Sequence, residues 1–349
     1  MRGSSHPLRL AMLAALLVTG TLLAGPRPVG ATPAGSRPAR PADPWALGTF
    51  TQISGTVYSC PATFDCFKFK LTACPNVTQD DTGAVATSYP AGPPRGVVVF
   101  FRGGSGADWW AFTPLSQRWM AGIRDNDGFV VVQIRYDIGW LTAPSGQQIG
   151  PAHLACRTAT VVQWIHDNIY LPLGINPIPG ECGYCITGNS GGSSAVSYPL
   201  AFYGQDAILN AVVPTGGPDH AAITKACLLV GGYSFNDQHR DTIDESYGYR
   251  DPVTNPGPCH LSDPSWTPTW DADSVDIGGN DYHYPFTRVE FIEGGKDSTG
   301  APFHAYDYWQ KLLQDPANEV TFDYLPNMPH KIAYYQPGLN ALEKALLKP

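Results

Sequence analysis

Positive charge is scarce in this sequence. Its 22 lysines and arginines are outnumbered by 30 aspartates and glutamates, which gives a formal net charge of -8 at pH 7. Partners that are strongly negative, such as nucleic acids and anionic membrane surfaces, are therefore disfavoured. We expect no nucleic-acid partner, and we expect neutral or uncharged substrates to suit the chain better.

Complete metal-binding patterns are also lacking. Cys182 and Cys185 form a C-x-x-C pair, but no second pair follows at zinc spacing. The stretch DADSVDIGGND (271–281) is rich in oxygen ligands, yet it lacks the glutamate and the spacing of a calcium loop. An ordinary solvated turn is favoured there. We expect neither a metal nor an organic cofactor.

The sequence has one notable apolar run, LAMLAALLVTGTLLAG (10–25), which is too short to span a membrane comfortably. Basic residues precede it and the small residues VGA (29–31) follow it. This pattern predicts a secretory signal peptide over residues 1–31, followed by a flexible lead-in over 32–47. We expect a secreted protein, extracellular or periplasmic, that has no stable membrane insertion after cleavage. Loss of the leader's three arginines would change the formal net charge to about -11.

The chain has eight cysteines, and an even number of cysteines in an exported chain predicts disulfide bonds. A pairing of Cys227 with Cys259 is the one that we single out, because both lie in one inserted segment. Cys182 and Cys185 precede a predicted strand rather than a helix, so we expect a structural role for them instead of a redox role. The eight cysteines are residues 60, 66, 74, 156, 182, 185, 227 and 259.

Predicted strands alternate with predicted helices from about residue 96 to the end of the chain. Two earlier alternating segments, 48–59 and 64–73, predict an opening hairpin. The alternation indicates an α/β protein with a mostly parallel sheet and helices on both faces, formed by one domain over residues 48–349. Residues 219–285 do not fit the alternation, and we interpret them as a cap inserted between the sixth and seventh core strands. The remaining expected strands are 96–101, 129–136, 183–188, 208–217, 288–295 and 319–326, and the expected helices are 112–126, 155–170, 193–204, 303–314 and 338–347.

A G-x-S-x-G pattern follows one of these strands, at Gly188-Asn189-Ser190-Gly191-Gly192. Between a strand and a helix, this spacing places the serine on a sharp turn whose small neighbours avoid clashes. The amide of Gly191 would then open the helix beside the serine hydroxyl, where it can donate to an oxyanion.

With this motif in its strand–turn–helix setting, the chain resembles the α/β-hydrolase superfamily over residues 48–349. That family orders its catalytic residues as serine, acid and histidine, and the last two follow the last two core strands. Asp297 follows the strand in RVEFIEGGKDSTG, and His330 follows the strand in EVTFDYLPNMPHKI. The resemblance implies Ser190 as nucleophile, His330 as general base and Asp297 as the orienting carboxylate.

The glycine-rich turn in FFRGGSGADWW follows the first buried parallel strand, and in this family it supplies the second oxyanion amide. Gly104 or Ser105 is the candidate donor beside Gly191. Arg102 stands where lipase-like members often have histidine. Trp109 and Trp110 follow the turn as candidates for a substrate pocket, although packing under the cap is an equal alternative. His220 is a further candidate for the pocket border, although a role in capping a helix is the favoured interpretation.

Alternatives exist for two of the three catalytic residues. Asp219 follows the strand that ends in VVPTGG, which is an alternative position for the acid in some members. His304 and His283 compete with His330, but neither of them follows a last strand. Pro199 falls about two turns into the helix after Ser190, where we expect it to kink or shorten that helix.

These features predict a secreted serine hydrolase that cleaves a small-molecule or polymeric carboxylic ester through an acyl-enzyme. An exported peptidase of the same fold is an alternative, because it uses the same triad. Such a peptidase needs a carboxylate cluster in the cap, for which Asp241, Asp244, Asp271 and Asp273 are available. A third interpretation is a hydrolase-like binding protein without catalytic activity. The complete Ser–Asp–His order argues against it.

Overall fold

A nine-stranded mixed sheet forms the centre of the described residues, which in this computed structural model are 45–177, 180–233 and 236–347. The predicted signal peptide (1–31) and residues 32–44 of the lead-in lie outside these ranges and remain predictions. The strands are β1 (Thr49–Ile53), β2 (Asp65–Thr72), β3 (Asp81–Ser88), β4 (Gly96–Phe101), β5 (Phe129–Tyr136), β6 (Tyr184–Asn189), β7 (Ala211–Thr215), β8 (Arg288–Gly294) and β9 (Val320–Leu325).

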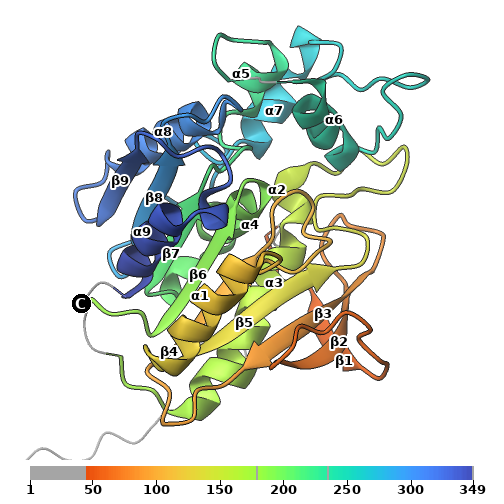
Figure 1. The fold of residues 1–349 in the computed structure, drawn as a ribbon. Helices are drawn as coiled ribbons and strands as arrows, with labels where there is room; N and C mark the ends of the chain where they lie inside the picture. The colour runs from red at the N-terminus through yellow and green to blue at the C-terminus, as the bar shows by residue number, and fades with distance from the viewer. Residues whose placement is uncertain (1–44, 178–179, 234–235, 348–349) are drawn as a thin grey trace, which may run out of the picture. The chain divides into compact units, whose positions relative to one another are not determined.

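The order of the strands is β1-β2-β3-β5-β4-β6-β7-β8-β9 (Figure 1). Pairing is antiparallel from β1 to β5 and parallel from β5 through β4 to β9. The mostly parallel α/β architecture and the opening β1–β2 hairpin are therefore confirmed. Parallel strands bring their carboxyl ends to one edge of a sheet, and the loops after β4, β6, β7, β8 and β9 meet there.

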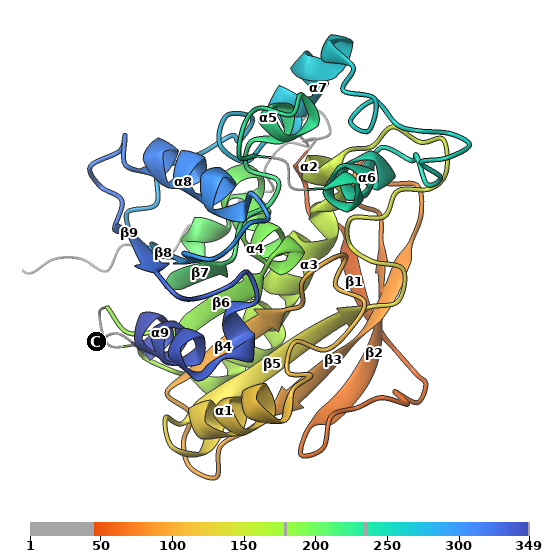
Figure 2. The same ribbon diagram turned by 45° about the horizontal axis from the view of Figure 1, so that its top comes forward.

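Helices cover both faces of the sheet, as predicted. Helices α1 and α9 pack on one face with Met120, Ile123 and Leu342 in their core. Helices α3, α4 and α8 lie on the other face (Figure 2). They bury Val161, Ala195 and several aromatic side chains there. The helices are α1 (Pro114–Asp125), α2 (Pro151–Leu154), α3 (Cys156–Ile165), α4 (Gly191–Tyr203), α5 (Ile223–Cys227), α6 (Asp237–Ser246), α7 (Thr267–Asp273), α8 (Ala301–Leu312) and α9 (Gln336–Leu347).

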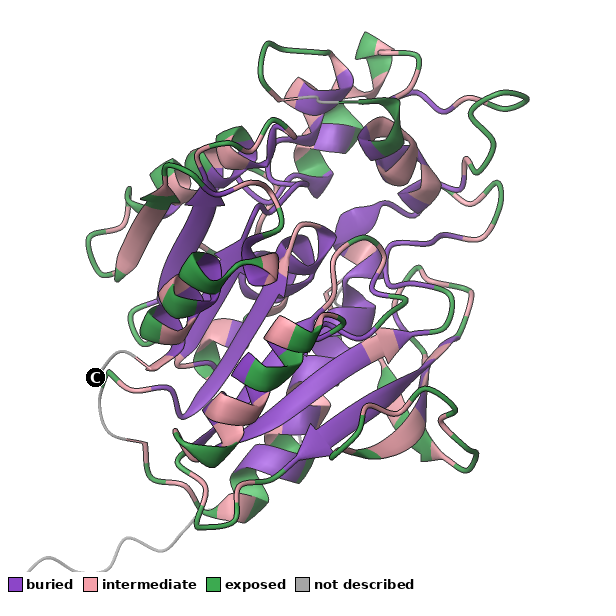
Figure 3. Cartoon of the chain, in the orientation of Figure 1, coloured by how far each residue is buried: buried purple, intermediate pink, exposed green. Residues whose placement is uncertain are grey.

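The central strands are buried on both faces. Every residue of β4, β7 and β8 is buried, whereas the outer sides of α1 and α9 carry exposed residues (Figure 3). Strands that are covered on both sides read as continuous apolar runs, and this is why GVVVFF and FVVVQIRY could be located from the sequence. None of the helices in the described ranges combines the length and the apolar character that crossing a membrane requires.

Two features of the fold differ from the sequence-based prediction. Strand β3, with the sequence DTGAVATS, was not predicted because its small and polar residues give no clear alternation. Helix α4 contains Pro199 and continues to Tyr203, so the proline does not shorten it as expected. The residues of α4 from Gly191 to Phe202 are buried, and this packing holds the helix together around the missing hydrogen bond.

All eight cysteines are paired. The predicted Cys227–Cys259 bond is present, and Cys182 is joined to Cys185 at the start of β6. The remaining bonds are Cys60–Cys66 and Cys74–Cys156. Cys74–Cys156 links the end of β2 to the start of α3, so it fastens the antiparallel part of the sheet to a helix on its face.

Candidate active site

Ser190 lies in a sharp turn between β6 and α4. Its backbone has φ 59° and ψ -127°, a conformation in which a residue with a side chain is strained. Close packing accounts for the glycines around it, because a Cβ on Gly188 would lie 2.2 Å from the carbonyl oxygen of Gly192. A Cβ on Gly192 would lie 2.4 Å from the carbonyl oxygen of Phe101 on β4. The G-x-S-x-G spacing is thus a steric requirement of this turn.

His330 and Asp297 are in contact, although 33 positions separate them in the sequence. Nδ1 of His330 lies 2.8 Å from Oδ2 of Asp297, whose side chain is fully buried. Thr299 donates from Oγ1 to the other oxygen of Asp297 at 2.6 Å and lies 3.0 Å from the same Nδ1. Because the carboxylate accepts, Nδ1 carries the proton and Nε2 keeps a lone pair for use as a base.

Electrostatics in this pair favour the charged acid. Burial alone would raise the pKa of Asp297, but the hydrogen bonds from His330 and Thr299 outweigh it and hold that pKa below its ordinary value. Burial alone would lower the pKa of His330, but the bond to Asp297 and the nearby Asp219 carboxylate raise it above the usual 6.5. The imidazole is therefore prepared to accept a proton.

Asp219 holds the hydroxyl of Ser190. Oγ of Ser190 donates to Oδ2 of Asp219 at 2.9 Å, and this carboxylate is only 4% exposed. Burial raises the pKa of Asp219 to about 6, although His330 and the Ser190 hydroxyl act in the opposite direction. Among the described side chains, Asp219 and not His330 is thus the partner of the Ser190 hydroxyl in this structure.

The glycine-rich turn after β4 packs directly against the serine turn. A Cβ on Gly191 would lie 2.2 Å from the carbonyl oxygen of Gly104, and one on Gly103 would lie 3.3 Å from the Cβ of Ser190. Gly191 is the first residue of α4, so its amide has no partner within the helix and adds to the positive end of the helix dipole. The turn and the helix start together can supply two amides to an oxyanion beside Ser190.

A cavity of about 530 Å³ opens over Ser190. Residues from seven parts of the chain line it: the segment after β4, the loop after β5, the serine turn, the loop after β7, the first turns of α6, the loop after β8 and the loop after β9. His220 and Trp110, two of the predicted pocket residues, are among them, as are Gly104, Gly191 and His330. Further lining residues, which the sequence analysis did not assign to a substrate pocket, are Phe112, Leu141, Asn236, Gln238, His239, Thr242, Thr299, Lys331, Ala333 and Tyr334.

Two predicted site residues lie elsewhere. The ring of Trp109 packs against Ala84 and Ala86 and donates to the Ser59 carbonyl at 2.5 Å, so it is part of the packing on β3. Ser105 is not in the cavity lining; its carbonyl accepts from Trp140 at 2.9 Å. Local contacts fix both positions, although Trp110 and Phe112 further along the same segment do line the cavity.

The rival histidines have other roles. His304 is buried behind the cavity, where it accepts from the Ala222 amide at 3.0 Å and donates to the Tyr233 carbonyl at 3.1 Å. His283 is on the surface and pairs with Asp315 at 2.7 Å. Burial lowers the pKa of His220, His239 and His304 to about 3 each, so these three rings are neutral.

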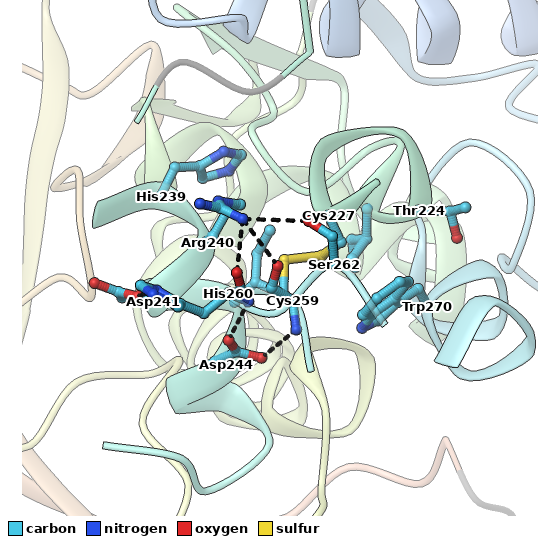
Figure 4. The surroundings of a disulfide bond; sticks show 12 residues. Thr224, Cys227, His239, Arg240, Asp241, Asp244, Cys259, His260, Ser262 and Trp270 are labelled. Carbon is cyan, nitrogen blue, oxygen red and sulfur yellow. Dashed lines mark hydrogen bonds and ion pairs between the residues drawn. A yellow bond between two sulfur atoms is a disulfide. The ribbon is translucent and has the colours of Figure 1, made fainter. Parts of the chain in front are cut away.

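The inserted segment contributes α6 to the cavity, and Figure 4 shows how this helix is fixed. Asp244 accepts from the backbone amides of Cys259 and His260 at 2.9 and 2.7 Å. Arg240 donates to the carbonyl of His260 at 2.8 Å, and the Cys227–Cys259 disulfide joins the same stretch to α5. His239 on α6 donates from Nε2 to the carbonyl of Asp219 at 3.0 Å, so the helix also holds the loop after β7.

Removing the Cys227–Cys259 bond should therefore destabilise the protein. The bond spans 32 residues, and loop-closure entropy gives a loss of about 4 kcal/mol for the Cys227→Ala/Cys259→Ala variant. The Cys60–Cys66 bond spans only 6 residues, so the matched Cys60→Ala/Cys66→Ala variant should lose about 2 kcal/mol. Urea denaturation measures both losses. An equal or larger loss in the second variant would contradict the entropic explanation.

Sequence reasoning missed three features of the site. The bond between Ser190 and Asp219 depends on a side-chain rotamer, for which the sequence has no signal. The role of Thr299 did have a sequence signal. An aspartate followed two residues later by a threonine is typical of a turn in which the aspartate carboxylate accepts a hydrogen bond from the backbone amide of the threonine. The amide of Thr299 does donate to Asp297 at 2.8 Å. The lining residues of α6 had no signal, because the insertion has no motif.

The strand order, the serine turn and the positions of His330 and Asp297 after the last two strands define the α/β-hydrolase fold. Among solved structures, the chain is similar to acetyl xylan esterase 1 from Thermoanaerobacterium sp. JW/SL YS485, with a TM-score of 0.50 and 11% identity over 87% of this chain and 88% of the other. The predicted fold class is thereby confirmed.

Two further structures show a weaker likeness. Est1E from Butyrivibrio proteoclasticus has a TM-score of 0.48 and 11% identity, covering 76% of this chain and 92% of that one. The acylaminoacyl peptidase of Pyrococcus horikoshii has a TM-score of 0.48 and 13% identity. The match covers 82% of this chain but only 42% of the peptidase's length. No protein-family model matches the sequence, and a search of curated proteins finds no match.

Proposed function

We propose that this protein is a secreted serine hydrolase that cleaves carboxylic esters. The observation that carries the proposal is that Ser190 and His330 line one cavity, while Asp297 binds Nδ1 of His330 and so leaves its Nε2 unprotonated. Two amide-bearing turns lie beside the same hydroxyl. The four disulfides support an oxidising compartment.

The reaction starts with a change of partner at Ser190. Its hydroxyl leaves Asp219 by rotation about the Cα–Cβ bond and donates to Nε2 of His330. Oγ then attacks the ester carbonyl while the proton moves to Nε2, and the negative charge on the carbonyl oxygen is stabilised by the Gly191 amide and the 103–104 turn. Asp297 keeps the imidazolium oriented.

Collapse of this intermediate breaks the ester C–O bond, and His330 gives its proton to the departing alcohol. Water then enters, His330 removes a proton from it, and the resulting hydroxide attacks the acyl carbon. The second collapse releases the carboxylic acid and returns the proton to Ser190. These steps use the ester, one water molecule and groups of this chain.

The pH dependence of turnover should show a raised histidine pKa. Because the contacts of His330 raise its pKa, the imidazole stays protonated and inactive to a higher pH than a free histidine would. We expect kcat/KM to fall in acid with an inflection above pH 6.5. Profiles from pH 4 to 9 with an aryl acetate test this, and an inflection near pH 4 would contradict the role of His330.

The structure gives little support to the peptidase alternative. The four cap acids that could grip an amino terminus already have partners: Asp241 pairs with His260, Asp244 with backbone amides, Asp271 with Thr224 and Asp273 with Tyr247. None of them is among the described residues that line the cavity. Comparing kcat/KM for p-nitrophenyl esters and aminoacyl anilides tests the proposal, which requires the esters to be clearly preferred.

A further inference from the structure

One wall of the cavity consists of two aromatic rings flanked by two cations. The guanidinium of Arg102 lies 3.6 Å from the ring centroid of Phe112, and Phe112 lies 4.5 Å from the ring of Tyr334. Nζ of Lys331 lies 5.0 Å from the centroid of Tyr334. All four residues line the cavity that contains Ser190. We call this group, Arg102, Phe112, Tyr334 and Lys331, the cationic wall.

The cations of this wall have no acidic partner. Within the described residues, neither Arg102 nor Lys331 forms an ion pair or a side-chain hydrogen bond, and their contacts are with ring faces. A guanidinium stacked on a ring still directs its N–H groups outward in the plane, where they can receive a carboxylate. The stacking also restricts these long side chains, which lowers the entropy lost on binding.

This arrangement stands out against the charge of the whole chain. The protein has a net charge of -8, and eight of its sixteen described lysines and arginines form an ion pair, such as Arg288 with Glu290. The one carboxylate among the described lining residues is Asp219, which is buried and bonded to Ser190. Lys331 is exposed and Arg102 is half-buried. The accessible charge of the cavity is therefore positive.

We infer that the preferred substrate is an ester that carries a carboxylate, which binds at Arg102 and Lys331 while its scissile carbonyl lies at Ser190. This inference rests on the proposed function and gives it a substrate class. It also revises the expectation of neutral substrates, which followed from the net charge alone. Net charge reports on long-range attraction, whereas recognition depends on the few charges that face the ligand.

Matched pairs of esters test the inference. The first pair places the charge on the alcohol side: 4-acetoxybenzoate, with its neutral isostere 4-acetoxybenzamide. The second places it on the acyl side: the mono-p-nitrophenyl ester of adipic acid, with the corresponding primary amide. Each kcat/KM is divided by the rate of hydroxide-catalysed hydrolysis of the same ester. We expect the charged member of at least one pair to be preferred about tenfold, and the pair that shows it identifies the side that faces the wall.

Variants assign the preference to the wall. In Arg102→Gln/Lys331→Gln the charged-to-neutral ratio should fall about tenfold, mainly through KM for the charged ester. The matched control Arg118→Gln/Lys344→Gln removes the same charge from exposed positions on α1 and α9 and should keep the ratio. Raising the ionic strength from 0.02 to 0.5 M should also lower the ratio in the wild type.

The inference is overturned if neither pair shows a preference, or if both double variants change the ratio equally. Circular dichroism spectra of both variants establish that they are folded. A different result would overturn the proposed function itself: none of the four esters would then be cleaved in a way that depends on Ser190. Ser190→Ala is therefore measured with every ester.

Discussion

Ser190→Ala should lower kcat for a good ester substrate by about 10⁶-fold. In the proposed mechanism the substitution removes the atom that forms the acyl-enzyme, while the proposed oxyanion amides and the cavity remain to provide a small residual rate. Alanine fits the position without new contacts, since Oγ of Ser190 has a single hydrogen bond, to Asp219. Steady-state hydrolysis of p-nitrophenyl acetate gives kcat, and the pre-steady-state burst of p-nitrophenol, which reports acylation, should disappear.

The control for this variant is another serine of the same helix. Ser197 lies on α4 and donates to the carbonyl of Ser193 at 2.8 Å, away from the cavity lining. Ser197→Ala should keep kcat within about tenfold of the wild type, because it removes one buried hydrogen bond only. A fluorophosphonate probe should label the wild type and Ser197→Ala, but not Ser190→Ala. Near-normal turnover by Ser190→Ala would exclude the proposed mechanism.

The sequence carried enough information to place Ser190, Asp297 and His330 near each other, for a topological reason. Each of them follows a strand that can be recognised from its β-branched and aromatic residues, and parallel strands end at a common edge. The glycine turn after β4 could be located in the same way. Once the strands are known, the proximity of the loops that follow them requires no further information about side chains.

Other features could not be obtained from the sequence, since they depend on packing at short range. Trp109 and Trp110 are adjacent in sequence but have different surroundings, since one ring packs on β3 and the other lines the cavity. The contribution of α6 to the cavity depends on the path of an insertion that has no repeating pattern. The partner of the Ser190 hydroxyl depends on a single torsion angle.

Asp219 and Asp297 therefore stand as two acids at one site, and the structure suggests distinct effects for their removal. Asp219 contacts the hydroxyl and Asp297 contacts the imidazole. An asparagine at 219 could still accept from Ser190, but it would no longer place a negative charge near His330. We expect Asp219→Asn to change kcat less than a hundredfold and to move the acid inflection of kcat/KM to lower pH, because the Asp219 carboxylate raises the pKa of His330.

Asp297→Asn should be far more damaging, with a loss in kcat on the order of 10⁴-fold. An amide at this position offers an N–H group to Nδ1 of His330, so the ring would carry its proton on Nε2 and could no longer accept one from Ser190. Fold and cavity should be unaffected, because the two side chains have the same shape. Parallel measurement of kcat in both asparagine variants tests the assignment. A severe loss in Asp219→Asn together with a mild one in Asp297→Asn would transfer the role of orienting acid to Asp219, the position after β7.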